Sequence, residues 1–94
     1  MELTHDFRQR TALLLGDERM ARLQNARVAV FGLGGVGGAC AEALCRAGVG
    51  RLTLVDNDTV SLSNINRQIV ALHSTVGQPK TAALRARLLD INPA

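Results

Sequence analysis

The sequence predicts an α/β fold in which a doubly wound parallel sheet is built from βαβ units. Three observations lead to this prediction. An apolar run at 28–31 is typical of a buried strand, and the glycine-rich stretch 32–38 follows it directly. Small and apolar residues then continue to Ala47, and a second apolar run at 52–55 ends in Asp56. A strand, a tight turn, a helix and a second strand ending in an acid together indicate a Rossmann-like nucleotide-binding unit.

The glycine turn suits a phosphate-binding role. Glycine permits backbone angles and close approaches that a Cβ atom would block. Main-chain N–H groups and the positive N-terminus of the following helix can therefore come close to a phosphate. Asp56 lies 24 positions after Gly32, near the offset at which an acid accepts hydrogen bonds from a ribose hydroxyl. The alternative is structural: the glycines only make a tight turn, and Asp56 caps or solvates the end of a strand.

The composition limits the classes of function. The chain has 94 residues, enough for one small domain, and its net charge of +3 fits an anionic ligand such as RNA without requiring one. It has no Trp or Tyr, which argues against a surface that stacks single-stranded bases. No apolar run reaches membrane-spanning length and no signal peptide is visible. We therefore expect a cytoplasmic protein with no membrane contact.

The chain divides into two parts. Residues 1–26 are expected to form an N-terminal arm with a short helix, in which Asp17 suits the N-cap and Met20 and Leu23 share one face. Residues 27–94 are expected to form the nucleotide-binding βαβ portion. Parallel sheets normally have both faces covered, and two or three strands would leave apolar faces open. We therefore interpret 27–94 as the N-terminal portion of a larger domain.

The helix after the glycine turn is expected to pack on the sheet through a narrow stripe of small residues. The stripe consists of Val36, Cys40, Ala43 and Ala47. Cys40 and Cys45 lack the spacing of a zinc or redox pair, so both are interpreted as core-packing residues in a reducing compartment, and no metal ligand is assigned. In the second strand, Leu52, Leu54 and Val55 are expected to be largely buried.

The segment 56–68 is rich in Asn, Asp and Ser, which favour turns. It is long for a connection between a strand and a helix, and such loops at the carboxyl ends of parallel strands often bind ligands. It places Asp58, Asn64 and Arg67 close to Asp56 in the sequence. The plainer interpretation is a polar surface loop.

A last helix is expected to begin at Pro79, which suits the first helical position. Its apolar stripe would be Leu84, Leu88 and Ile91. Lys80 lies in the first turn, where a cation is disfavoured, and a lysine there makes more sense if it meets an anion. His73 lies beside a turn without a metal-spaced partner, and we interpret it as structural.

Four motifs together resemble the adenylating superfamily, which includes ubiquitin-activating enzymes and the bacterial activators of sulfur-carrier proteins. The motifs are Gly32-x-Gly34-Gly35-x-Gly37, Asp56-x-Asp58, Ser63-Asn64-x-x-Arg67-Gln68 and Gly77-x-Pro79-Lys80. They follow the family's order and spacing over about residues 10–93. Within the superfamily, the chain is most similar to the tRNA threonylcarbamoyladenosine dehydratases. That similarity lies in two stretches, Arg10-Thr11-x-Leu13-Leu14-Leu15-Gly16 and Ile65-Asn66-Arg67-Gln68-Ile69-x-Ala71-Leu72-His73. In the second stretch, the sulfur-carrier activators usually have Leu-Gln-Arg-Gln in place of Ile65-Asn66-Arg67-Gln68.

The resemblance implies an ATP site with Mg²⁺ as a further cofactor. The implied cofactor-binding residues are Gly34, Gly35, Asp56, Asp58, Ser63, Asn64, Arg67, Gln68 and Lys80. Asp56 would hold the ribose, with Asp58 close by, and Asn64, Arg67 and Lys80 would contact the phosphates. The implied catalytic residues are Arg10, Arg67 and Lys80. Arg10 would reach across a homodimer interface to the partner subunit's ATP. The aspartate expected to help bind magnesium would lie beyond Ala94, so the stretch would hold half of a site and would be inactive alone.

The implied function is ATP-dependent activation of a carboxylate, with tRNA as the partner, to cyclise a modified adenosine next to the anticodon. One alternative is an adenylyltransferase for a ubiquitin-like sulfur-carrier protein, and another is an inactive nucleotide-binding or dimerisation module. An NAD-binding domain would need the glycine turn and Asp56, but would not need Arg67 and Lys80 to converge on a triphosphate. That difference favours ATP over NAD.

Overall fold

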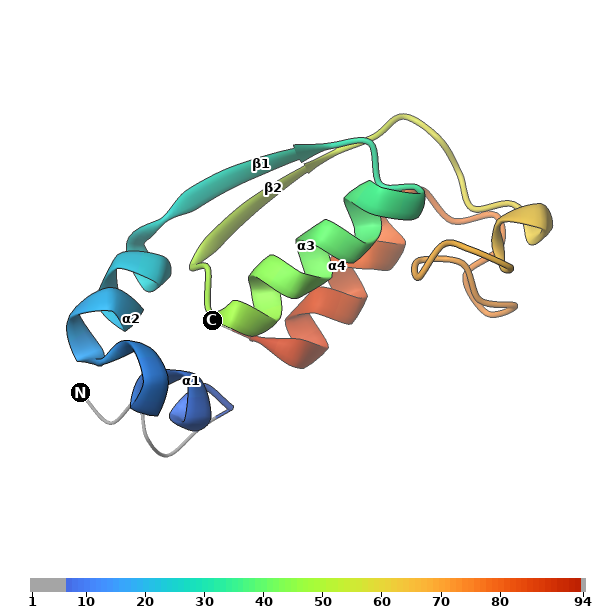
Figure 1. The fold of residues 1–94 in the computed structure, drawn as a ribbon. Helices are drawn as coiled ribbons and strands as arrows, with labels where there is room; N and C mark the ends of the chain where they lie inside the picture. Colours follow the sequence, from blue (N-terminus) through green and yellow to red (C-terminus); the bar gives the residue numbers. More distant parts are fainter. Residues whose placement is uncertain (1–6, 94) are drawn as a thin grey trace.

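The computed structural model of the chain describes residues 7–93, which form helices on one side of a parallel two-stranded sheet (Figure 1). The elements, in chain order, are α1 (Gln9–Leu15), α2 (Asp17–Asn25), β1 (Arg27–Phe31), α3 (Gly35–Ala47), β2 (Arg51–Val55), the 3₁₀ helix η2 (Leu62–Asn64) and α4 (Lys80–Ile91). The predicted βαβ unit and the helical arm before it are thus both present. The expected last helix begins one residue after Pro79.

The two strands pair in parallel from Arg27 opposite Arg51 to Phe31 opposite Val55. Helices α3 and α4 cover one face of this sheet (Figure 1), where Val30 is buried. On the opposite face, Phe31 is 75% exposed and Val55 is 40% exposed. The expectation that Val55 is buried is therefore wrong. Side chains alternate between the two faces of a strand, so Val55 points away from the helices that its neighbour Leu54 contacts.

The expected contact stripe of α3 is also wrong, because the helix packs on the sheet through a different face. Val36 is 87% exposed and Cys40 is exposed, whereas Gly38, Ala41 and Cys45 are buried. This orientation follows from a close approach at the start of the helix. A Cβ atom at position 37 would lie 1.7 Å from the carbonyl oxygen of Gly32, so only glycine fits there. The interpretation of Cys40 as a core residue is therefore wrong. The interpretation of Cys45 as a core residue is confirmed.

One core cluster lies between the sheet, α3 and α4, and it includes the fully buried Leu33 and Leu84. The predicted stripe of α4 is confirmed, since Leu88 is buried as well and Ile91 packs against the cluster. A second, smaller cluster in the arm joins Met20 to Ala12. Within the described residues, every helix is too short or too polar to cross a lipid bilayer.

The long connection between β2 and α4 is a folded loop whose two ends meet. Thr59 and Pro79 form an antiparallel bridge. Next to it, the N–H of Val60 donates to the carbonyl of Gln78 at 2.8 Å. From the middle of the loop, Val70 and Ala71 enter the main core. The loop therefore has a fixed position beyond the ends of the strands (Figure 1).

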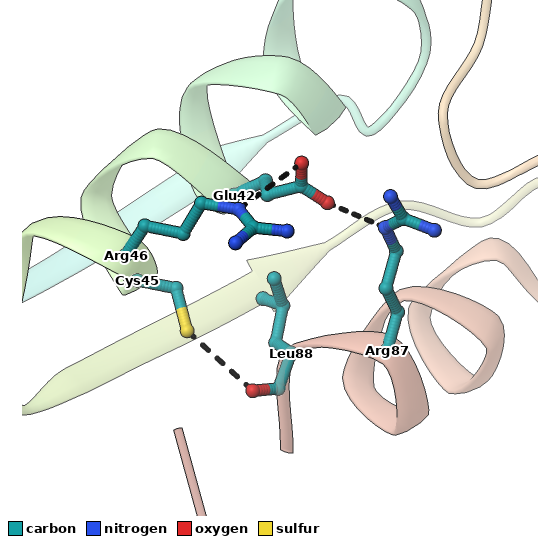
Figure 2. A network of polar contacts seen from close by, with 5 residues as sticks. All are labelled: Glu42, Cys45, Arg46, Arg87 and Leu88. Atoms are coloured by element: carbon teal, nitrogen blue, oxygen red, sulfur yellow. Dashed lines mark hydrogen bonds and ion pairs between the residues drawn. The ribbon is translucent and has the colours of Figure 1, made fainter. Parts of the chain in front are cut away.

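A charged brace joins α3 to α4 on the helical side of the fold (Figure 2). The Nε of Arg87 donates to Oε1 of Glu42, and the Nε of Arg46 lies 3.5 Å from Oε2 of the same carboxylate. The hydrogen bond from Arg87, aided by both positive charges, lowers the pKa of Glu42 although partial burial opposes it. Beneath the brace, the thiol of Cys45 donates to the carbonyl of Leu88 at 3.5 Å.

The two cysteines are expected to differ sharply in reactivity. Burial raises the pKa of the Cys45 thiol, and the thiolate is the reactive species. Cys40 is exposed. A thiol-specific reagent should therefore label Cys40 at least about tenfold faster than Cys45 under native conditions. Single Cys40→Ser and Cys45→Ser variants assign the two rates, and equal rates in the folded protein would contradict the packing of α3.

Candidate functional site

The strands end at one edge of the sheet, and most of the predicted site residues lie in the segments that follow them (Figure 1). Several contacts join these segments. The backbone N–H of Lys80 donates to the carbonyl of Asp58 at 3.0 Å, and the side chain of Gln68 lies against Gly34. The residues that belong to this connected region are Gly34, Gly35, Asp56, Asp58, Ser63, Asn64, Arg67, Gln68 and Lys80.

Asp56 connects the two loops that leave the strand ends. Its Oδ2 accepts the backbone N–H of Leu33 at 2.7 Å, and its Oδ1 accepts the N–H of Asp58 at 2.8 Å. The bond from Leu33, then that from Asp58, and lastly the positive charge of Lys80 hold the pKa of this carboxyl below its usual value, against the effect of burial. Each carboxylate oxygen can accept a second hydrogen bond, so Asp56 can bind a ligand hydroxyl without releasing either loop.

The start of α3 is open in front of the glycine turn. Gly34 is the N-cap of the helix and Gly35 is its first residue. A Cβ atom added at Gly35 would meet no atom within 4 Å, so the fold itself does not require glycine there. The first N–H groups of a helix have no intrahelical partner and attract anions. The unoccupied space at Gly35 is therefore where a phosphate could meet these donors.

Lys80 is a largely buried residue whose charge acts on Asp56. The residue is only 7% exposed, and its charge contributes to the lowered pKa of Asp56. Among residues 7–93, however, no carboxylate lies within ion-pair distance of Lys80. Its ammonium is not among the fully buried atoms, so the stem is packed while the charged end reaches solvent. An anionic ligand at the glycine turn would give this ammonium a direct partner.

The loop after β2 positions two polar side chains differently. Asn64 is buried, and its Oδ1 accepts the backbone N–H of Ser61 at 2.9 Å. This bond leaves its amide group available as a donor. Arg67 is exposed; its Nη1 donates to the carbonyl of Ser63 at 3.1 Å and to Oδ1 of Asn66 at 3.0 Å. Both bonds involve neutral acceptors, so the guanidinium keeps its full positive charge for a ligand.

Gln68 lies behind the glycine turn. Its Nε2 would be 3.1 Å from a Cβ atom at Gly34, so its carboxamide fills the space that a larger residue at position 34 would need. Gln68 is 9% exposed, and its Oε1 is buried without a hydrogen-bond partner in the described part of the chain. Buried polar atoms are normally paired, which makes this oxygen unusual.

Arg10 is the one predicted site residue that the structure does not bring to this region. It lies in α1, at the end of the molecule opposite the loop between β2 and α4 (Figure 1). Its side chain is exposed. Over the described range 7–93, no group of three or more His, Cys, Asp or Glu residues could hold a metal ion.

Sequence reasoning missed the backbone donor Leu33 and the bridge between Thr59 and Pro79. Leu33 occupies a variable position of the glycine motif, so no residue type marks it. The bridge joins positions 20 apart, and neither Thr nor Pro signals such pairing. The brace of Glu42 and Arg87 was missed for the same reason, since 45 positions separate the two.

The arrangement has the chemistry of a nucleotide site. A helix N-terminus, a buried lysine and an exposed arginine provide positive charge for phosphates. Asp56, at the end of the neighbouring strand, provides an acceptor for sugar hydroxyls. A larger groove of about 440 Å³ lies elsewhere, between β2 and α4, and its lining includes Thr53, Arg85 and Leu89. That groove is not lined by the glycine turn, Asp56, Arg67 or Lys80.

Comparison with known proteins agrees with this interpretation. The model of the ThiF family matches residues 8–94. The chain belongs to the ThiF family. The resemblance to the adenylating superfamily and the expected Rossmann-like fold are thereby confirmed.

Three ThiF-family relatives illustrate the similarity. The chain is 54% identical over 91 residues to the tRNA threonylcarbamoyladenosine dehydratase of Bacillus subtilis (strain 168), covering 97% of this chain and 35% of the relative. It is 53% identical over 76 residues to the molybdopterin-synthase adenylyltransferase of Salmonella typhimurium (strain LT2), covering 81% of this chain and 30% of the relative. The structure of Escherichia coli tRNA N6-threonylcarbamoyladenosine dehydratase in complex with ATP aligns with a TM-score of 0.87 at 45% identity, covering 92% of this chain and 37% of that one. The chain thus spans about a third of the length of these relatives.

The double hydrogen bond of Asp56 predicts a pH-dependent contribution to stability. Asp56→Asn places an NH₂ group against a backbone N–H, and we expect it to lower the free energy of unfolding at pH 7 by about 1–3 kcal/mol. Asp58→Asn is the matched control, because the Asp58 side chain is exposed and makes no hydrogen bond among the described residues. It should change the same quantity by less than about 0.5 kcal/mol.

The sign of the pH effect follows from the lowered pKa of Asp56. The folded pKa lies below the unfolded value of about 3.9, so the stabilisation is fully present above about pH 4 and is lost as the pH falls through the folded pKa. Denaturant titrations at pH 7 and at about pH 3 should therefore show a smaller difference between wild type and Asp56→Asn in acid. A difference that stays constant would contradict the role of the charged carboxylate.

Gly37 and Gly35 form a matched pair with opposite expectations for stability. Gly37→Ala forces the backbone at Gly32 to move, and we expect a loss of about 1–3 kcal/mol or more in unfolding free energy. Gly35→Ala meets open space in a helix, where alanine is favoured over glycine by up to about 1 kcal/mol. It should leave stability unchanged or raise it, as measured by urea unfolding. Equal destabilisation by both variants would contradict the geometry of the turn.

Proposed function

We propose that the protein carrying this chain uses ATP to adenylate the carboxylate of a threonylcarbamoyl group on an adenosine of tRNA, and so acts as a tRNA threonylcarbamoyladenosine dehydratase. The observation that supports this most directly is the buried Lys80. It lies beside Asp56 at the edge that also holds the open helix N-terminus and has no carboxylate in contact among the described residues. Such a constellation suits a polyphosphate bound to a nucleoside. The dehydratase relatives cover nearly the whole of this chain.

The proposed roles follow from the positions of the groups. Gly34 and Gly35 let the nucleotide approach the backbone, and Asp56 accepts the ribose hydroxyls with Asp58 close by. The phosphate contacts come from the loop residues Ser63, Asn64, Arg67 and Gln68 and from Lys80. Mg²⁺, when bound, would neutralise charge on the phosphate oxygens.

In the reaction we propose, a carboxylate oxygen attacks the α-phosphorus of ATP and pyrophosphate leaves. A nucleophile of the same modified nucleoside then attacks the activated carbonyl, closes a ring and releases AMP, which retains the carboxylate oxygen. Charge builds up on phosphate oxygens in the first step. Arg67 can bind these oxygens through a planar fork and Lys80 can act as a point charge, and such preorganised groups provide much of the rate enhancement.

Arg10 is proposed to act on the nucleotide of a second subunit. It is exposed on α1 and lies far from the nucleotide groups of its own chain (Figure 1). We propose that it completes the site of the partner in a homodimer. The exposed Leu13 and Leu14 on the same helix support an interface there, since they are 78% and 83% exposed. A tRNA-modifying role would place the protein in the cytoplasm.

The test measures AMP formation from ATP with three acceptors: tRNA bearing threonylcarbamoyladenosine, the same tRNA without the modification, and a ubiquitin-like sulfur-carrier protein. We expect turnover only with the modified tRNA. Lys80→Met and Arg67→Ala should each lower turnover by about 100-fold, as loss of a transition-state donor commonly does. Arg85→Ala is the control, because Arg85 is exposed on the same helix as Lys80 but lines the groove between β2 and α4.

The other outcomes select among the alternatives. AMP attached to the C-terminal glycine of the carrier, without a tRNA requirement, would indicate the adenylyltransferase function of relatives such as the Salmonella enzyme. ATP binding without turnover would indicate a nucleotide-binding or dimerisation module. Binding of NAD with an affinity that Arg67→Ala does not change would indicate an ordinary dinucleotide-binding domain.

A further inference from the structure

A second, shallow groove of about 360 Å³ adjoins the proposed nucleotide site. Its walls come from the loop between β2 and α4 and from Arg87 of α4. Two of its lining residues, Arg67 and Gln68, also belong to the proposed nucleotide site. Gln68 contacts the glycine turn from behind. Arg67 can therefore contact both a group bound in this groove and a bound nucleotide.

The groove is positively charged. Arg67 and Arg87 line it, and none of its lining residues is acidic. Both guanidinium groups are held in place. Arg67 is held by the carbonyl of Ser63 and the side chain of Asn66, and Arg87 donates through Nε to Glu42 (Figure 2). The ion pair with Glu42 uses only Nε of Arg87, so its terminal nitrogens remain available. Two guanidinium groups that are held in place and line one groove suit a carboxylate.

The groove also has an apolar wall. Ile65, Ile69 and Leu72 line it together with the two arginines. Gln68 lines it as well, but its buried Oε1 lies against the glycine turn, closed to solvent. A ligand that joins a carboxylate to a small apolar group would therefore match this lining.

We propose that this groove is the acceptor subsite, which binds the threonylcarbamoyl side chain of the modified adenosine. This inference rests on the function proposed above. The side chain has two features that the groove would recognise: a carboxylate for the arginines and a methyl group for the apolar wall. Arg67 then lies between carboxylate and phosphate and brings the attacking oxygen toward the α-phosphorus.

The test places a bulky side chain in the groove and leaves the proposed nucleotide-binding residues unchanged. Leu72→Trp adds bulk at a position that lines the groove and is 48% exposed, so the fold should tolerate it. Leu62→Trp is the matched control, being 61% exposed on η2 and outside the groove lining. In the full protein we would measure ATP affinity, the KM for modified tRNA in AMP formation, and calorimetric binding of the free nucleoside N6-threonylcarbamoyladenosine with adenosine as the comparison.

We expect Leu72→Trp to raise the KM for modified tRNA by at least about tenfold, the scale of discrimination that a misfitted side chain produces in a pocket. It should weaken binding of the modified nucleoside to the same extent, with ATP affinity unchanged. Leu62→Trp should match wild type in all three measurements. Arg87→Lys, which retains the charge opposite Glu42 but loses the fork, should also raise the KM for tRNA and leave ATP affinity unchanged.

Two failures are distinguishable. Wild type that forms AMP with modified tRNA, together with unchanged KM values in Leu72→Trp and Arg87→Lys, would overturn the acceptor subsite and leave the proposed function intact. Wild type that forms no AMP with modified tRNA would overturn the proposed function and the subsite with it. Turnover that depends on the sulfur-carrier protein and is blocked by Leu72→Trp would assign the groove to a peptide terminus, and so also overturn the proposal.

Discussion

The candidate site depends on the carboxylate of Asp56. It accepts one backbone N–H from the turn after β1 and another from the loop after β2. Two strands of a parallel sheet fix only their own residues, and loops beyond the strand ends are otherwise free to separate. By joining both loops, Asp56 keeps the glycine turn and the polar loop at a constant separation. Its role in holding the fold therefore comes before any role toward a ligand.

The rest of the site is built outward from this connection. The carbonyl of Asp58, next to the connection, accepts the first N–H of α4 and so places Lys80 beside Asp56. The bridge between Thr59 and Pro79 closes the base of the long loop, and Gln68 packs the middle of the loop against Gly34. Each step is short and local. Together they place residues up to 46 positions apart in the chain, from Gly34 to Lys80, around one open space.

The sequence predicted those parts of the fold in which residue type alone decides the structure. A glycine turn between two apolar runs and an acid at the second strand end admit few other arrangements, and the motif residues from Gly34 to Lys80 do gather in one region. The burial of α3 was mispredicted because several rotations of the helix offer small residues at suitable spacing. The contact between Gly37 and Gly32, which selects the rotation, has no side chain to mark it. Val55 was mispredicted because an apolar run does not say which faces of its sheet are covered.

The position of Lys80 has a consequence for stability. Its ammonium has no carboxylate in direct contact among the described residues, so an anion that binds beside it gains a favourable charge interaction. Folding and ligand occupancy are then linked quantities, since whatever binds only the native state shifts the folding equilibrium toward it. The protein measured in nucleotide-free buffer would therefore be a less stable molecule than the same chain in the presence of its anionic ligand.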